Sequence, residues 1–226
     1  MTYDVKIIRW NNFHSVLFTL LFILYTVLSL RFPVIIGGAI SFLYYWIIHL
    51  GILKTFKPFA GYANRTTSLR LILVIIAGIF YNNLPDFVLF FIGISIFSLD
   101  GLDGYLARKF NQKSEFGAYF DMETDAFYVC IFTIILFEKD FAGYWILIPG
   151  FLRYFYGTII LLVGRKAKEE IRTKLGPVIA GIFFVSILSP FVLSSAFYNP
   201  ALIVSSSLVV MSFIYSFIQN LSFITD

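Results

Sequence analysis

Charged residues are scarce in this chain, and that scarcity excludes an ordinary soluble protein. Only 13% of the 226 residues are charged, whereas 59% are hydrophobic and 20% are aromatic. Water-facing domains carry about 25% charged residues. Several apolar runs reach the roughly 20 residues that a helix needs to cross a bilayer. The composition therefore predicts an all-α protein, a polytopic transmembrane helical bundle without a separate soluble domain.

Cysteine and histidine are also rare, which argues against disulfide, redox or histidine-metal chemistry. Cys130 is the only cysteine, and its apolar neighbours predict a buried structural thiol. His14 and His49 are isolated at or within predicted spans, where we expect packed side chains rather than metal ligands. The sequence lacks a large basic surface interleaved with aromatic residues, so we expect no nucleic acid partner.

Charges, prolines and asparagine pairs divide the chain into candidate spans. The eight predicted spans cover residues 13–30, 33–53, 67–81, 86–108, 117–137, 141–164, 174–195 and 200–218. No small-residue cleavage site follows the first apolar run, so we expect a retained span and not a signal peptide.

Basic residues fall almost entirely on one side of the membrane if these spans alternate. That side would hold fourteen of the seventeen, namely Lys6, Arg9, Lys54, Lys57, Arg65, Arg70, Arg108, Lys109, Lys113, Arg165, Lys166, Lys168, Arg172 and Lys174. The positive-inside rule places this side, with both termini, in the cytoplasm. We expect an integral protein of the bacterial inner (cytoplasmic) membrane, although attraction of the +4 net charge to anionic membrane lipids also explains several of these residues.

Four aspartates interrupt the fourth and fifth predicted spans. Residues three or four apart share a helix face, so Asp100 and Asp103 form one acidic stripe and Asp121 and Asp125 form another. The short loop 109–116 makes the two helices antiparallel neighbours. At about 1.5 Å per residue, the stripes lie at matching depths of roughly 7 to 13 Å below that loop. The sequence thus predicts one pocket lined by four carboxylates.

Carboxylates at this depth require either protonation or bound cations. Oxygen ligands on a rigid helical frame suit Mg²⁺ or Mn²⁺, and two such ions would balance four carboxylates. Two-metal sites are suited to phosphoryl chemistry. Beside the acids, Gly104, Ala107 and Gly117 favour close approach of a ligand, although helix packing also explains such residues. Arg108 could contact a phosphate or anchor the helix at the interface.

Glu123 does not belong to the acidic stripes. It is two residues from both Asp121 and Asp125, which turns it to the opposite side of the helix. Arg153 lies inside the sixth predicted span, where a charge needs a partner or a polar cavity. We therefore expect Glu123 to contact another helix, with Arg153 as the candidate partner.

The acidic residues belong to the pattern DxxDGxxAR, eight residues, then GxxxDxxxD. This pattern resembles the signature of the CDP-alcohol phosphatidyltransferase family at every fixed position, namely Asp100, Asp103, Gly104, Ala107, Arg108, Gly117, Asp121 and Asp125. Upstream, Asn64, Thr67 and Arg70 in "NRTTSLR" are similar to the NxxTxxR entry to the first family helix. The resemblance covers two-thirds of the chain and implies a six-helix core within residues 57–226, preceded by two accessory transmembrane helices within residues 1–56.

The resemblance implies a membrane enzyme that uses divalent metal to displace CMP from a CDP-linked substrate. An alcohol would attack the phosphorus distal to cytidine. The implied metal ligands are Asp100, Asp103, Asp121 and Asp125, with Asp125 also the catalytic base. The implied nucleotide and diphosphate contacts are Asn64, Thr67, Asp103, Gly104, Ala107, Arg108 and Gly117. The family resemblance is also compatible with a homodimer.

Two substrate arrangements share this signature. CDP-diacylglycerol with a small polar alcohol is favoured, because a lipid headgroup can reach the pocket while its acyl chains stay among the spans. The alternative is CDP-choline or CDP-ethanolamine with diacylglycerol. Candidate residues for a phosphorylated acceptor are Arg70, Arg153, Lys168, Arg172 and Lys174. Several of them would serve equally well as inside-positive anchors, so the acceptor alcohol stays open.

Two further classes compete with an active transferase. A cation transporter would also use intramembrane carboxylates, but it needs polar residues across the whole membrane. Residues 87–99 and 127–137 offer only hydroxyls, one thiol and glycine. A catalytically dead relative is the second alternative, and the intact eight-position signature argues against it.

Overall fold

The computed structural model describes residues 5–163 and 175–222, and within these ranges all regular secondary structure is helical. The longer helices are α1 (Val5–Leu28), α2 (Phe32–Ile48), α4 (Gly61–Phe80), α5 (Asp86–Lys109), α6 (Glu115–Glu138), α7 (Leu147–Leu162), α8 (Gly176–Ser186) and α9 (Ser195–Ser222). The short segments are α3 (Leu50–Leu53), η1 (Tyr144–Ile146) and η2 (Ser189–Phe191). The predicted all-α bundle is confirmed.

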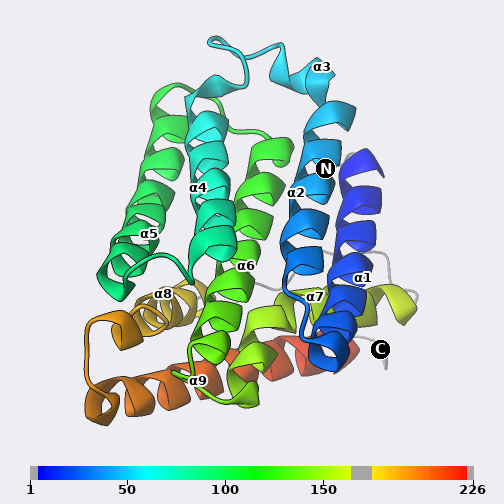
Figure 1. Cartoon of the computed structure of the whole chain (residues 1–226). Coiled ribbons are helices and arrows are strands. Elements are labelled where there is room, and N and C mark those ends of the chain that lie inside the picture. Colours follow the sequence, from blue (N-terminus) through cyan, green and yellow to red (C-terminus); the bar gives the residue numbers. More distant parts are fainter. Residues whose placement is uncertain (1–4, 164–174, 223–226) are drawn as a thin grey trace.

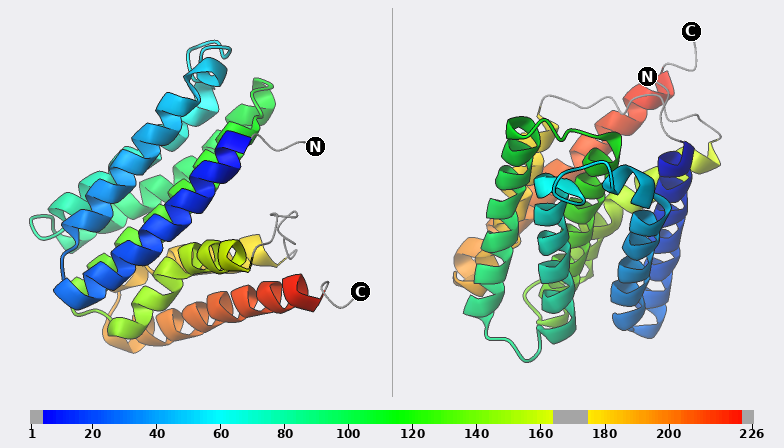
Figure 2. Two further views of the ribbon diagram at one scale, coloured as in Figure 1. Left: turned by 90° about the vertical axis from the view of Figure 1, so that its right-hand side faces the viewer. Right: turned by 90° about the horizontal axis from the view of Figure 1, so that it is seen from above.

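Helices α1, α2, α4, α5 and α6 run side by side, whereas α7, α8 and α9 cross them at a steep angle (Figures 1 and 2). Helix α6 lies at the centre and packs against both α4 and α7. Every residue from Phe127 to Leu136 of α6 is buried, including the Cys130 thiol, as its apolar neighbours predict. Helix α6 is therefore the element against which the rest of the bundle is arranged.

Five of the described helical segments are long and apolar enough to cross a membrane, namely α1, α4, α5, Tyr144–Leu162 and Ser195–Gln219. Helix α2 and the segment Gly176–Phe191 are apolar but shorter. Large apolar side chains such as Val27 and Ile36 are exposed, as expected for surfaces that face lipid. The chain is an integral membrane protein, and the count of eight spans stays a prediction.

Several helix ends differ from the prediction for local reasons. Helix α1 begins at Val5 and not at residue 13, because Lys6 and Arg9 continue the helix instead of ending it. Helix α4 begins six residues earlier than predicted, directly after Ala60, whose φ of 66° breaks the preceding turn. Helix α8 stops at Ser186, ahead of the short 3₁₀ segment that contains Pro190.

The end of the bundle opposite the start of α4 carries a compact polar cluster. Arg31 Nη1 lies 3.1 Å from Glu138 Oε2, and the hydroxyl of Tyr25 donates to Glu138 Oε1 at 3.1 Å. The hydroxyl of Tyr81 also donates to Glu138, and the Arg31 guanidinium lies 4.6 Å from the Tyr81 ring centroid. We call Tyr25, Arg31, Tyr81 and Glu138 the far-end cluster. It joins residues from four segments that the alternating spans predict on one side.

Candidate functional site

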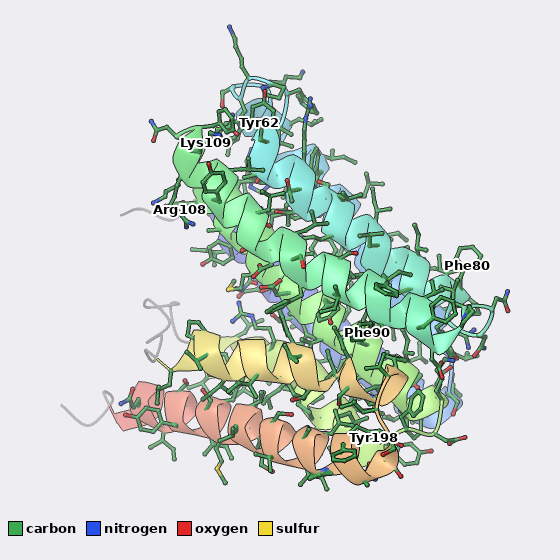
Figure 3. All side chains as sticks on the ribbon, turned by 90° about the vertical axis from the view of Figure 1, so that its left-hand side faces the viewer. Tyr62, Phe80, Phe90, Arg108, Lys109 and Tyr198 are labelled. Carbon is green, nitrogen blue, oxygen red and sulfur yellow. The ribbon has the colours of Figure 1, made fainter. Side chains whose placement is uncertain are left out.

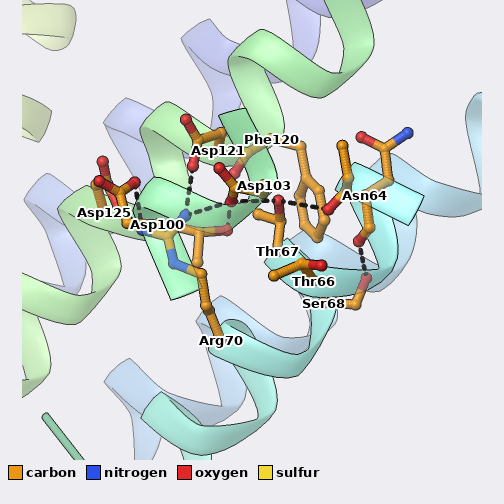
Figure 4. Close-up of polar contacts among 12 residues, drawn as sticks. Asn64, Thr66, Thr67, Ser68, Arg70, Asp100, Asp103, Phe120, Asp121 and Asp125 are labelled. Carbon is orange, nitrogen blue, oxygen red and sulfur yellow. Dashed lines mark hydrogen bonds and ion pairs between the residues drawn. The ribbon is translucent and has the colours of Figure 1, made fainter. Parts of the chain in front are cut away.

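Aspartates from α5 and α6 converge as the sequence predicts. Asp100, Asp103 and Asp121 each offer a carboxylate oxygen, and these oxygens lie within 4.8 Å of one another. Asp125 lies beside them, one turn along α6 (Figure 4). We call these four residues the acid cluster. Its hard oxygen donors fit a divalent cation such as Mg²⁺ or Mn²⁺.

Arg70 of α4 reaches into the acid cluster and pairs with all four carboxylates. Its Nη1 lies 2.7 Å from Asp103 Oδ2 and 2.5 Å from Asp121 Oδ1, and its Nη2 lies 3.0 Å from Asp100 Oδ1. Nη2 also pairs with Asp125 (Figure 4). The Arg70 side chain is only 1% exposed. Its guanidinium therefore occupies the centre of the cluster, and the acceptor-binding role expected for Arg70 stays a prediction.

The surroundings of Arg70 show which sequence signal could have placed it there. Thr67, one turn earlier on the same face of α4, donates its hydroxyl to Asp103 Oδ2 at 3.0 Å. Both side chains belong to the stretch "NRTTSLR", so the face that carries Thr67 also carries Arg70 into the acid cluster. One guanidinium facing four partly exposed carboxylates leaves excess negative charge, unless some carboxyl groups are protonated or a further cation binds.

A pocket of about 220 Å³ opens beside the acid cluster. Its lining residues are Ala63, Asn64, Thr67, Asp103, Gly104, Ala107, Gln112, Lys113, Ser114, Gly117, Ala118 and Asp121. Six of them belong to the predicted nucleotide and diphosphate contacts. At Gly117 a Cβ atom would lie 2.8 Å from Asn64 Oδ1, so a side chain there would collide with the pocket wall. Arg108 lies outside this lining, but its Nη1 would lie 3.5 Å from a Cβ at Gly104.

The pocket opens at the end of the bundle that is rich in basic residues. Figure 3 shows Arg108 and Lys109 at the same end as Tyr62, in the first turn of α4, and Phe80 at the opposite end. Lys113 of the loop after α5 lines the pocket itself, and a positive side chain there favours an anionic ligand.

A model of the CDP-alcohol phosphatidyltransferase family matches residues 61–218, from the first residue of α4 into α9. The chain belongs to the CDP-alcohol phosphatidyltransferase family. All eight signature positions of this family member lie within the match, and so do Asn64, Thr67 and Arg70.

Two curated relatives are similar over shorter stretches. The CDP-diacylglycerol–inositol 3-phosphatidyltransferase of Candida albicans is 54% identical over 57 residues, which are 25% of this chain and 24% of the relative. The CDP-diacylglycerol–glycerol-3-phosphate 3-phosphatidyltransferase of Wigglesworthia glossinidia brevipalpis is 43% identical over 53 residues, which are 24% of this chain and 29% of the relative. The chain thus spans less than a third of either relative's length.

Sequence reasoning missed the loop residues that close the pocket of this phosphatidyltransferase family member. The Gln112 side chain accepts from Tyr62 N at 2.8 Å and donates to Lys57 O at 3.1 Å, so it ties the loop after α5 to the start of α4. Ser114 Oγ accepts from Gly117 N at 3.0 Å and caps α6. A serine three residues before Gly117 is a helix-start signal that could have identified this cap.

The other predicted acceptor residues fall into two groups. Arg153 of α7 donates from Nη2 and Nε to Glu123 Oε1, at 2.9 and 3.2 Å, so the expected pairing of these two residues is confirmed. Lys168, Arg172 and Lys174 lie outside the described residues. The acceptor roles of all four stay predictions.

Proposed function

We propose that this protein transfers a phosphatidyl group from CDP-diacylglycerol to the hydroxyl of a small polar alcohol, releases CMP, and thereby synthesises a phospholipid. The acid cluster beside a pocket with glycine in its wall is the observation that carries this proposal. The names of both relatives contain CDP-diacylglycerol. The proposed active site faces the cytoplasm, because the predicted cytoplasmic side carries most of the basic residues.

In this proposal Asp100, Asp103 and Asp121 hold Mg²⁺ or Mn²⁺, and Asp125 completes a site for two ions. Bound divalent ions supply electrostatic stabilisation to the diphosphate and to the departing phosphate. Arg70 lies within reach of the same carboxylates, so it partly neutralises them when fewer cations are bound.

The reacting groups are an alcohol oxygen and the phosphorus distal to cytidine. A bond forms between this oxygen and that phosphorus, and the bond from the phosphorus to the oxygen of the departing CMP breaks. Asp125 accepts the proton of the attacking hydroxyl, which requires an unprotonated carboxylate oxygen within hydrogen-bond reach. The protein otherwise contributes position and charge, which dominate in phosphoryl transfer.

The pocket wall supports the placement of the nucleotide half of the donor. Gly104, Ala107 and Gly117 present little or no side chain, so the diphosphate can approach the helix backbones. Asn64 and Thr67 offer polar atoms on the α4 side of the same pocket. Arg108 would contact phosphate oxygens from its place beside Gly104.

The proposal includes candidate residues that bind the acceptor alcohol, and assembly as a homodimer. Arg70 and Arg153 already make ion pairs, so an acceptor phosphate would share them with carboxylates. Lys168, Arg172 and Lys174 are the further candidates, and a homodimer is the proposed assembly. Inositol and glycerol 3-phosphate, which occur in the names of the two relatives, are the first acceptors to test.

The test is CMP release by purified protein in lipid, with CDP-diacylglycerol and Mg²⁺ or Mn²⁺. Glycerol 3-phosphate, inositol, inositol phosphate, serine and choline are offered one at a time. Release with one alcohol, lost in Asp125→Asn but retained in Glu138→Gln, supports the proposal and names the acceptor. Release only with CDP-choline or CDP-ethanolamine and diacylglycerol would overturn the donor assignment. No release with any pair would overturn the proposed reaction.

A further inference from the structure

Glu123 of α6 forms a buried anchor between two residues of the acid cluster. It follows Asp121 by two positions and precedes Asp125 by two, and its side chain is fully buried. On one side it accepts the two hydrogen bonds from Arg153 of α7. On the other side its Oε2 lies 4.0 Å from His14 Nε2 of α1. Moving a buried carboxylate away from its partners is costly, so these contacts fix this turn of α6.

His14 is held in one orientation by the accessory helices. Trp10 Nε1 donates to Ser41 O at 3.0 Å and to Ser41 Oγ at 3.2 Å, and Ser41 Oγ lies 2.7 Å from His14 Nδ1. The Ser41 hydroxyl can accept from Trp10 and donate its own hydrogen to Nδ1 at the same time. We assign a ring hydrogen of His14 to Nε2 on this pattern, and Nε2 lies 4.0 Å from the Glu123 carboxylate.

Packing reinforces that orientation. The His14 ring lies between aromatic rings of α1, α2 and α7, with centroid distances of 4.7 Å to Trp10 and Phe18, 5.1 Å to Phe42 and 5.6 Å to Tyr154. Next to it, α1 and α7 approach so closely that a Cβ at Gly157 would lie 2.3 Å from Ser15 Oγ. The helix pair α1–α2 therefore presents a rigid polar group to Glu123.

We propose that α1 and α2 set the position of the acid cluster, with His14 as a positioning residue that acts through Glu123. This inference rests on the proposed function, and it gives the two accessory helices a role in the reaction. The same helix pair also contacts α6 through Tyr25 and Glu138. Glu138 lies 15 residues beyond Glu123, about 22 Å along the helix, so that second contact cannot orient the aspartates directly.

This geometry provides a matched pair of variants on α1. His14→Phe and Tyr25→Phe each keep an aromatic ring and remove one polar group that faces a glutamate of α6. Mn²⁺ binding is measured by electron paramagnetic resonance on full-length protein in lipid, together with kcat, KM and the unfolding midpoint. We expect His14→Phe to weaken Mn²⁺ binding about 10-fold, the lower range for supporting residues of metal ligands, and to lower kcat more than it raises KM. Tyr25→Phe should leave the Mn²⁺ affinity, kcat and KM unchanged, although it should lower the unfolding midpoint by a comparable amount.

A purely structural role for His14 predicts a different result. Wild-type Mn²⁺ affinity in His14→Phe, or an equal loss in Tyr25→Phe, would overturn the inference. His14→Gln keeps an N–H that can point at Glu123, so it should recover most of the Mn²⁺ affinity. If His14→Phe does not fold, Ser41→Ala, which releases the ring, is compared with Tyr25→Phe, and wild-type affinity in Ser41→Ala then overturns the inference.

The two proposals can fail separately in this experiment. Wild-type protein that binds Mn²⁺ but releases no CMP contradicts the proposed reaction, whereas weaker binding in His14→Phe still supports positioning. Wild-type protein that releases CMP, with normal Mn²⁺ binding in His14→Phe, contradicts the positioning role alone.

Discussion

The acid cluster and the far-end cluster are both polar groups at helix contacts of α6, but their charges balance differently. In the far-end cluster one carboxylate, Glu138, meets one guanidinium, Arg31, and two tyrosine hydroxyls complete its contacts. In the acid cluster four carboxylates share one guanidinium. The charges of the first cluster balance within the protein, whereas the second carries excess negative charge that the proposed divalent cations would balance.

This difference separates a structural polar contact from a functional one. A balanced pair holds helices together, and its removal should change stability alone. An unbalanced cluster beside a pocket is the candidate metal site, and removal of one of its carboxylates should change the rate of the reaction. Both clusters include acidic residues of α6, so matched variants of the two clusters can be compared in one protein.

The largest difference between the clusters should be seen in turnover. We expect Asp125→Asn to lower kcat for CMP release about 10²- to 10⁴-fold, the range for loss of a general base, with little change in the unfolding midpoint. Glu138→Gln should show the reverse, a lower midpoint with turnover close to wild type. Equal turnover in these two variants would contradict the division into a functional and a structural cluster.

Replacement of the arginine in each cluster should have the next largest effect, seen in how far Mn²⁺ restores the unfolding midpoint. Arg70→Gln leaves four partly exposed carboxylates without their guanidinium, which should lower the free energy of unfolding by less than the about 3–5 kcal/mol of a fully buried pair. Because Mn²⁺ can replace that positive charge, it should raise the unfolding midpoint of Arg70→Gln more than that of wild type. Arg31→Gln should gain no more from Mn²⁺ than wild type does, and thermal unfolding with and without Mn²⁺ measures both.

Metal removal should affect one cluster only. At a free Mn²⁺ concentration of 100 times Kd, binding to the folded protein adds about 2.7 kcal/mol of stability. A chelator should therefore lower the wild-type unfolding midpoint and abolish CMP release, and added Mn²⁺ should restore both. In Asp103→Asn the midpoint should respond weakly to either treatment. An unchanged response in that variant would place the stabilising ion elsewhere.

The smallest expected effect lies in the far-end cluster. Tyr81→Phe keeps the ring against Arg31 but removes the hydroxyl that donates to Glu138. Loss of this hydrogen bond should cost about 1 kcal/mol, seen as a lower unfolding midpoint, and CMP release should not change. A tenfold loss of turnover would show that the far end of α6 influences the site.

The sequence predicted the acid cluster because helix periodicity and a short loop determine which residues face one another. Helix periodicity also predicted that Glu123 points away from Asp121. An isolated charge within a predicted span made Arg153 its candidate partner, and this pairing is confirmed. Sequence reasoning did not place Arg70 in the cluster, because a basic residue near a predicted span end has an alternative explanation as a membrane anchor. The contact between His14 and Glu123 joins residues 109 positions apart, and spacing along the chain carries no information on such tertiary contacts.

Helix ends were predicted less well than helix order. Polar residues before Thr67 lie outside the predicted span, yet they belong to the first turns of α4, where Asn64 lines the pocket and the Tyr62 ring lies 4.5 Å from that of Phe110. Hydropathy predicts where a helix stops contacting lipid. A helix that continues into a site lined by protein extends beyond that point, so its end is missed.

The most direct test of the unbalanced acid cluster is a Mn²⁺ titration of wild-type protein in lipid, followed by electron paramagnetic resonance. The account predicts saturable binding that is lost or weakened at least tenfold in Asp121→Asn and is unchanged in Glu138→Gln. Absence of saturable binding in wild type, or equal binding in all three proteins, would contradict the central claim that the four aspartates form a divalent-metal site.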